Sequence, residues 1–179
     1  MKYIPKDCFK SFLEIDFNYY LNNGFNTIIS DLDNTLALYS EAIPNNELIN
    51  KINELKKLGF KIYLISNNNK KRVETFIKDL NIDGALANSN KPFKNKLKKY
   101  LKKNNIDTLH TIGIGDQLLT DILVFNKLNI CPILVRTLNF KKQKWYTKIN
   151  RLREKRIIKK IKKENKMIGE KIEKICQDV

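Results

Sequence analysis

Five short apolar segments alternate with segments of helical periodicity, and this alternation limits the fold more than any other feature of the sequence. The apolar segments span residues 25–29, 60–65, 84–87, 109–114 and 130–135. Most are rich in the branched residues that favour strands. Strands separated by single helices favour parallel pairing, because each crossover returns the chain to the same edge. The pattern predicts an α/β fold: a doubly wound, Rossmann-like parallel sheet of five strands with helices on both faces.

The charge distribution divides the chain into a domain and a tail. We expect a single domain over 1–140, beginning with a helix over 5–22 in which aromatic residues recur at helical spacing. Residues 141–179 hold 15 Lys or Arg and 5 Asp or Glu, in a chain whose formal net charge is +16. Apolar residues at helical spacing predict a basic amphipathic helix or helix pair there. This tail either docks on the domain with a solvated basic face or binds an anionic membrane or nucleic acid.

Composition excludes several kinds of site. Cys8, Cys131 and Cys176 lie far apart and form no CxxC pair, so neither a disulfide framework nor a structural zinc site is expected. His110 is the single histidine, which excludes a multi-histidine metal site within one chain. The first residues lack the apolar core of a signal peptide, and no apolar run is long enough to span a bilayer. We therefore expect a cytoplasmic protein, free or held at the inner face of the membrane.

Two carboxylates follow the first apolar segment directly. Asp31 and Asp33 stand at the end of a segment that reads as a buried strand. Burial of these acids is costly unless a cation or hydrogen-bond donors meet them. Taken alone, the pair fits either a turn built on aspartate side chains or a functional site.

Three later segments also end in distinct polar residues. Ser66, Lys91 and the pair Asp116 and Asp121 follow successive predicted strands. The carboxyl ends of parallel strands meet at one edge of an open sheet, where ligands bind. Carboxylates with one lysine and one hydroxyl at this edge predict a site for phosphate and Mg²⁺, since Mg²⁺ prefers oxygen ligands. Asn67 could either contact the substrate or shape the turn.

The order of these residues resembles that of a known superfamily. Asp31-Leu-Asp-Asn-Thr35, then Ser66, Lys91 and Gly115-Asp-Gln-Leu-Leu-Thr-Asp121 resemble the four motifs of the haloacid-dehalogenase-like (HAD) hydrolases, phosphatase branch. These motifs span residues 25–121. Ser66-Asn-Asn-Asn69, Lys91-Pro92 and the basic segment 148–157 resemble more closely the YqeG group of subclass IIIA. That group is related to the mitochondrial-type phosphatidylglycerophosphate phosphatases. The segment 136–138 departs from the group, where a more apolar stretch containing proline is expected.

The resemblance implies a reaction and a role for each residue. It implies a HAD-like, capless fold and Mg²⁺-dependent hydrolysis of a phosphomonoester, with Asp31 as the nucleophile that forms an aspartyl-phosphate. Asp33 would be the general acid and base. Mg²⁺ would be bound by Asp31, Asp116 and the backbone carbonyl of Asp33, while Asp121 would orient Lys91 or a water. Ser66, Asn67 and Lys91 would bind the phosphate.

The resemblance and the basic tail together suggest a substrate. The expected substrate is a phospholipid head group, phosphatidylglycerophosphate at an anionic membrane surface. Two alternatives stay open at this point. The same chemistry could act on a nucleic-acid end or a soluble phosphate ester, or the chain could be a non-catalytic protein that binds nucleic acid through its basic surface.

Overall fold

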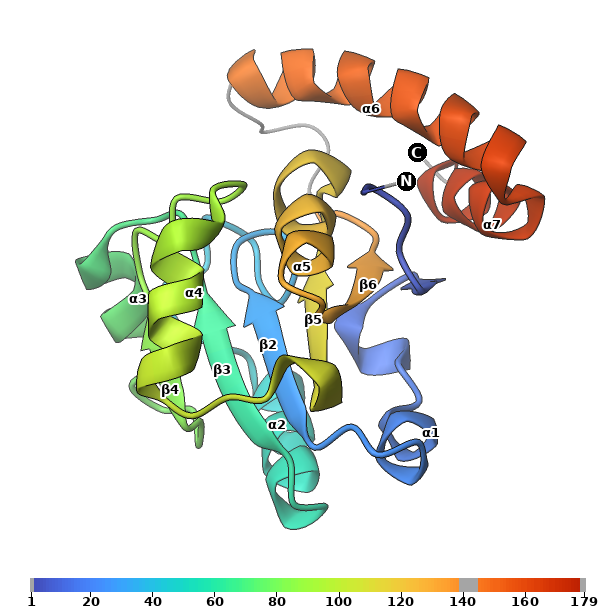
Figure 1. Ribbon diagram of the computed structural model, residues 1–179. Coiled ribbons are helices and arrows are strands. Elements are labelled where there is room, and N and C mark those ends of the chain that lie inside the picture. Colours follow the sequence, from blue (N-terminus) through green and yellow to red (C-terminus); the bar gives the residue numbers. More distant parts are fainter. Residues whose placement is uncertain (1, 139–144, 178–179) are drawn as a thin grey trace.

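The computed structural model describes the backbone of residues 2–138 and 145–177, and the side chains of 2–138 and 153–175. Its centre is a parallel sheet of six strands in the order β1-β6-β5-β2-β3-β4 (Figure 1). The strands are β1 (Asp7–Phe9), β2 (Thr27–Asp31), β3 (Lys61–Ile65), β4 (Gly84–Leu86), β5 (Thr111–Gly115) and β6 (Cys131–Val135). The predicted doubly wound α/β fold is confirmed, although the sheet has six strands and not five.

Helices cover both faces of this sheet. They are α1 (Phe17–Asn22), α2 (Asn46–Lys57), α3 (Lys70–Ile77), α4 (Lys94–Lys103) and α5 (Leu123–Lys127). Residues from α1, α2 and α3 share one hydrophobic cluster, and residues from α4 and α5 share another. Figure 1 shows α4 and α5 in front of the sheet and α2 behind it. The helices therefore form the outer two of three layers.

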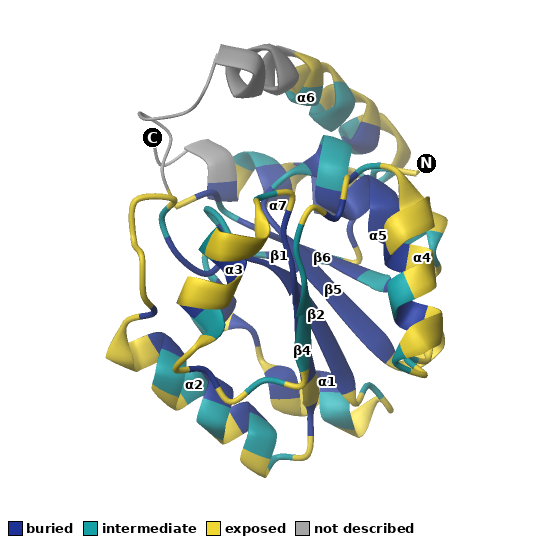
Figure 2. Ribbon diagram, turned by 90° about the vertical axis from the view of Figure 1, so that its left-hand side faces the viewer, coloured by how far each residue is buried: buried dark blue, intermediate teal, exposed yellow. Residues whose placement is uncertain are grey.

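Alternating side chains along the central strands fill the two cores. Ile28 belongs to the cluster on the α2 face, and its neighbour Ile29 belongs to the cluster on the α4 face. Leu64 and Ile65 on β3 divide in the same way. All four side chains are fully buried, and Figure 2 shows the strands as the buried centre of the molecule. A strand covered on both faces has no polar side, which is why these segments read as continuous apolar runs.

The predicted helix over 5–22 is wrong for most of its length. The chain forms β1, then a short 3-10 helix (Phe12–Glu14), and only then α1. The first segment is extended because it completes the sheet beside β6: Lys6 N donates to Pro132 O at 2.7 Å, and Arg136 N donates to Phe9 O at 3.1 Å. Phe12 and Phe17 are nevertheless buried in the core. The error therefore lies in the backbone that carries these residues.

The basic tail forms two helices, α6 (Trp145–Glu164) and α7 (Lys166–Gln177). Ile161, Ile168 and Ile172 are buried in one cluster with Cys8 of β1 and Leu134 of β6. The helix pair thus covers the β1 side of the sheet. In both Figures 1 and 2, α6 lies beyond the carboxyl ends of the strands. Within the described residues, none of the helices has the length and apolar character needed to cross a bilayer.

The connections at the carboxyl edge are short. The one helix between β2 and β3 is α2, and the one between β3 and β4 is α3, all within the described residues. A parallel crossover needs one such helix, so these connections contain no inserted domain. The edge on which the predicted polar residues converge is therefore bordered by loops, and α6 passes beyond it.

Candidate active site

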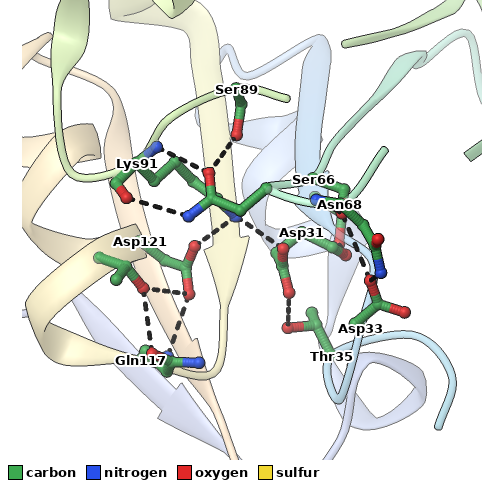
Figure 3. Close-up of polar contacts among 12 residues, drawn as sticks. Asp31, Asp33, Thr35, Ser66, Asn68, Ser89, Lys91, Gln117 and Asp121 are labelled. Carbon is green, nitrogen blue, oxygen red and sulfur yellow. Dashed lines mark hydrogen bonds and ion pairs between the residues drawn. The ribbon is translucent and has the colours of Figure 1, made fainter. Parts of the chain in front are cut away.

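Asp31, Lys91 and Asp121 form a buried ion-pair cluster at the carboxyl edge of the sheet (Figure 3). Lys91 Nζ lies 2.6 Å from Asp31 Oδ1 and 2.6 Å from Asp121 Oδ1. The other oxygen of Asp31, Oδ2, accepts a hydrogen bond of 2.9 Å from Thr35 Oγ1. Both oxygens of Asp31 are thus held in place, which fixes the orientation of the carboxylate.

Asp116 adds a third carboxylate beside this cluster. Its Oδ2 accepts a short hydrogen bond of 2.6 Å from Thr137 Oγ1. Its Oδ1 is buried and has no hydrogen-bond partner among the residues the structure describes. Asp31, Asp116 and Asp121 each offer an oxygen within 4.8 Å of the other two. One lysine cannot neutralise three buried carboxylates, so a further cation is needed to stabilise this cluster in its charged form.

The donor set identifies the kind of cation that fits. All three groups are carboxylates, which are hard oxygen ligands, and neither sulfur nor imidazole lies among them. Such a set suits Mg²⁺ and other hard divalent ions and disfavours zinc, which prefers nitrogen and sulfur. The clearest indication of a bound cation is Asp116 Oδ1, which is buried without a hydrogen-bond partner among the described residues. A buried carboxylate oxygen is costly in free energy unless a cation or a hydrogen-bond donor binds it.

The turn after β5 brings Asp121 back against the strand. Asp121 lies in a short π-helix (Leu118–Ile122), and its Oδ2 accepts from the backbone N–H of Gln117 at 3.1 Å. A Cβ at Gly115 would lie only 2.3 Å from Asp121 Cβ, so glycine is required for this approach. Glu154 of α6 accepts a hydrogen bond from Leu118 N at 2.8 Å. The tail helix therefore helps to fix the turn that presents Asp121.

The electrostatics follow from burial and crowding. Burial raises the pKa of Asp31 to about 6, against the opposing effect of Lys91 and with a further rise from the Asp121 charge. Burial and the charges of Asp121 and Asp31 raise the pKa of Asp116 well above its usual range. Burial works to lower the pKa of Lys91, but the charges of Asp121 and Asp31 outweigh it and raise that pKa. Lys91 is therefore charged at neutral pH.

The raised pKa of Asp31 predicts a pH dependence of stability in chelator-treated protein. The folded state holds this proton more tightly than the unfolded chain, because the pKa is about 6 in the fold against an ordinary 3.8. The stabilisation is complete below pH 3.8 and is lost as the pH rises through 6. From pH 7.5 to 5, the free energy of unfolding of wild type should gain about 1 kcal/mol relative to Asp31→Asn.

Denaturant titrations of both proteins at the two pH values measure this difference. Saturating Mg²⁺ should shrink it, because a bound cation competes with the proton for the same carboxylates. Equal pH dependence in the two metal-free proteins would show that Asp31 does not titrate in this range.

Asp33 lies beside the cluster and makes a separate set of contacts. Its Oδ1 accepts hydrogen bonds from Arg72 Nη2 at 3.0 Å and Nε at 3.2 Å. Its Oδ2 accepts longer bonds of 3.3 Å from Ser66 Oγ and from Asn68 Nδ2. The structure thus brings Ser66 next to Asp33, and Lys91 next to Asp31, as the shared strand edge predicts. The carboxylate of Asp33 remains outside the three-carboxylate group.

Asn67 is bound to the loop that carries Lys91. Its Oδ1 accepts from Lys91 N at 2.7 Å and from Ser89 Oγ at 2.8 Å, and its Nδ2 donates to Lys91 O at 2.9 Å. Both ends of the amide are therefore engaged with the loop that carries Lys91. This contact favours a role in holding Lys91 in place over direct binding of phosphate.

Sequence reasoning missed four residues that contact the site. These are Thr35, Arg72, Thr137 and Glu154, of which the first belongs to the Asp31–Thr35 motif but was given no role in the site. Arg72 has no distinguishing signal in the sequence, because Lys70 and Lys71 lie beside it in the same first turn of α3. The segment 136–138, noted above for its departure from the YqeG group, contributes Thr137 to the site itself.

His110 lies away from this edge. It belongs to a 3-10 helix (Thr108–His110) that precedes the amino end of β5, and its Nδ1 is 2.6 Å from Asp107 Oδ2 in an exposed pair. His110 thus lies at the opposite end of the strand from the carboxylate cluster and is not part of that site. The described residues at the carboxyl edge offer carboxylates, the cations Lys91 and Arg72, and hydroxyls.

Comparison with known proteins agrees with this geometry. Residues 1–137 match the profile of the family described as mitochondrial PGP phosphatase. That match covers most of the chain, and the chain belongs to this family of phosphatases within the HAD-like hydrolase superfamily. The predicted class of enzyme, a HAD-type phosphatase, is thereby confirmed.

Individual relatives support the same assignment. The chain is 30% identical over 161 residues to "Probable phosphatase YqeG" of Bacillus subtilis (strain 168), a match that covers 90% of this chain and 92% of the relative. A crystal structure of an uncharacterized protein from Listeria monocytogenes serotype 4b shares the fold, with a TM-score of 0.54 and 20% identity. The aligned region covers 67% of this chain and 85% of the Listeria chain.

Proposed function

We propose that this phosphatase is Mg²⁺-dependent, works through an aspartyl-phosphate on Asp31, and acts on phosphatidylglycerophosphate at an anionic membrane surface. The observation that carries the chemistry is the buried cluster in which Lys91 and two further carboxylates surround Asp31. The lipid substrate is supported by the family description and by the basic helices beside the site.

The first half of the reaction transfers the phosphoryl group to the enzyme. Asp31 attacks phosphorus and forms an O–P bond while the bond from phosphorus to the leaving oxygen breaks. Asp33 gives its proton to that oxygen, which departs as an alcohol. Lys91 and Ser66 bind the transferring phosphoryl oxygens, and their positive charge and hydroxyl donor stabilise the transition state.

The second half releases phosphate. Asp33, now ionised, takes a proton from water as the water oxygen attacks phosphorus, and the bond to Asp31 breaks. Asp31, Asp116 and the backbone carbonyl of Asp33 would hold Mg²⁺, and Asp121 keeps Lys91 in place through their ion pair. Bound Mg²⁺ would supply charge neutralisation for the phosphoryl oxygens.

The surface around this edge supports a substrate that is embedded in a membrane. Among the side chains of α6 and α7 that the structure describes, the exposed basic residues are Arg153, Lys155, Arg156, Lys159, Lys160, Lys163, Lys166, Lys171 and Lys174. Such a surface is attracted to anionic lipids by about 1 kcal/mol for each basic residue near the bilayer. Tyr39, Ile43 and Phe93, on loops after β2 and β4, are more than half exposed. Exposed apolar side chains of this kind would add to contact with a lipid interface.

Phosphate release from three substrates tests the proposal. Phosphatidylglycerophosphate in anionic mixed micelles should be hydrolysed with a higher kcat/KM than glycerol phosphate or an oligonucleotide bearing a terminal phosphate. A chelator should stop the reaction, and added Mg²⁺ should restore it. Good turnover of either water-soluble substrate, with none of the lipid at any detergent ratio, would contradict the lipid assignment while leaving the chemistry intact.

Charge reversal on the tail separates membrane contact from chemistry. Lys159→Glu combined with Lys163→Glu should raise KM for the lipid about tenfold or more in anionic micelles, since each exchange replaces an attraction by a repulsion. The effect on glycerol phosphate should be much smaller. The matched control is Lys102→Glu with Lys103→Glu at the far end of α4, where both side chains are also exposed. Equal effects from the two pairs would argue against a specific role for α6.

A further inference from the structure

Arg72 of α3 binds one oxygen of Asp33 and leaves the other oxygen facing the phosphate-binding residues. Two N–H groups of the guanidinium, Nε and Nη2, donate to the same atom, Asp33 Oδ1, at 3.2 and 3.0 Å. The side chains are largely sequestered, with 13% of Arg72 and 16% of Asp33 exposed. A charge-assisted contact of this kind is stronger and more directional than an ordinary hydrogen bond.

The guanidinium is itself fixed by the loop that follows β2. Arg72 Nη2 donates to Leu38 O at 3.3 Å, and Nη1 donates to Glu41 O and to Ala42 O. Its Cζ atom also lies 5.1 Å from the centre of the Phe76 ring on the same helix. Arg72 is therefore held by three backbone carbonyls and the Phe76 ring, and Asp33 Oδ1 lies against it. A rigid partner of this kind fixes the direction in which the carboxylate points.

The second oxygen of Asp33 has weaker and exchangeable partners. Oδ2 accepts hydrogen bonds of 3.3 Å from Ser66 Oγ and from Asn68 Nδ2, near the long limit for such bonds (Figure 3). Ser66 is the residue assigned above to a phosphoryl oxygen. When a phosphate ester arrives, this hydroxyl can turn to the ester, and Oδ2 loses a partner at the moment when a reacting oxygen comes near.

We propose that Arg72 is a positioning residue for proton transfer: it holds Asp33 by Oδ1 so that Oδ2 delivers the proton to the leaving oxygen. This inference rests on the proposed function, in which Asp33 is the general acid and base. The proton moves from Oδ2 to the leaving oxygen as the P–O bond breaks and the bond from Asp31 to phosphorus forms. In the second half Oδ2 takes a proton from the attacking water. Oδ1 stays with Arg72 throughout.

Leaving groups of different basicity test this role. The ratio kcat/KM reports only the steps up to departure of the leaving group, and an alkyl leaving group needs a proton that 2,4-dinitrophenolate does not. Arg72→Ala should lower kcat/KM about 10²-fold for glycerol phosphate, the usual size of general acid catalysis, and less than about tenfold for 2,4-dinitrophenyl phosphate. Asp33→Asn should show the same selectivity, and the double variant should lose little more than either single variant.

Two further variants guard against a loss of folding. Arg72→Lys keeps the charge and should retain an intermediate rate on glycerol phosphate, and guanidinium ion should partly restore Arg72→Ala. Lys71→Ala, an exposed neighbour on the same helix, is the matched control and should leave both substrates unaffected. If Arg72→Ala lowered kcat/KM equally for the two substrates, or if the losses of the two single variants added in the double variant, the positioning role of Arg72 would be overturned. The proposed function would stand. Wild-type protein that, with Mg²⁺, releases phosphate from neither of these substrates nor from phosphatidylglycerophosphate would overturn the proposed function as well.

Discussion

Asp31→Asn should abolish phosphate release, with a loss of about 10⁴-fold or more in kcat on every substrate that the wild type hydrolyses. Asparagine has almost the same shape and can still accept a hydrogen bond from Thr35, so the surrounding geometry should persist. It lacks the anionic oxygen that attacks phosphorus, and no acyl-phosphate can form on its amide. Release of inorganic phosphate, measured with saturating Mg²⁺, provides the comparison.

A control separates this effect from a general loss of structure. Asp79→Asn removes a carboxylate from an exposed position beyond the end of α3 and should leave kcat within twofold of wild type. Thermal melting should show that Asp31→Asn is folded, because Lys91 keeps its ion pair with Asp121. Turnover by Asp31→Asn within about tenfold of wild type would rule out covalent catalysis by this residue.

Lys91→Met should weaken both the catalysis and the fold. Methionine fills a similar volume but leaves Asp31, Asp116 and Asp121 without their cation, in a site where both paired side chains are at most 10% exposed. Loss of one partner from a buried ion pair costs about 3 kcal/mol or more in free energy of unfolding. Loss of a positive charge from the phosphoryl site should lower kcat about 10³-fold.

The loss of stability should itself depend on what neutralises the carboxylates. In chelator, the loss in free energy of unfolding caused by Lys91→Met should be largest at pH 7.5. It should be smaller at pH 5 or with saturating Mg²⁺, because protons and the cation both relieve the repulsion among the three carboxylates. Lys94→Met, an exposed position at the start of α4, is the matched control and should change neither property. A Lys91→Met protein as stable as wild type in chelator at pH 7.5 would show that the carboxylates need no cation there.

The sequence predicts the parts of the molecule that follow from local pattern. Strands β2 to β6 appear where apolar runs predicted them, within about two residues. Four of these five strands are buried on both faces, and such a strand must be apolar almost throughout. The convergence of Asp31, Lys91 and Asp121 is predictable for a related reason. Parallel strands bring their carboxyl ends together whatever the helices between them contain.

The missed features depend on partners that are distant in sequence. β1 has only three residues, and it is extended because Cys8 pairs with Leu134 of β6, which no local pattern reveals. In the same way, Thr137 and Glu154 contact the site from beyond the last predicted motif. Arg72 was hidden for another reason: it belongs to a helix whose lysines all read as solvated charge, and only tertiary structure distinguishes it from them.

The pairing of β1 with β6 has a consequence for the order of events during translation. Because the chain is made from its amino end, Asp7–Phe9 leaves the ribosome long before Cys131–Val135, the strand beside which it lies. Until α7 is also made, Cys8 lacks the isoleucine residues that cover it. The nascent chain must therefore complete its sheet from the middle outward, with an open strand edge that can pair with other chains. Slowing synthesis after residue 135 should prolong that state and increase aggregation, and co-expressed chaperones should reduce it.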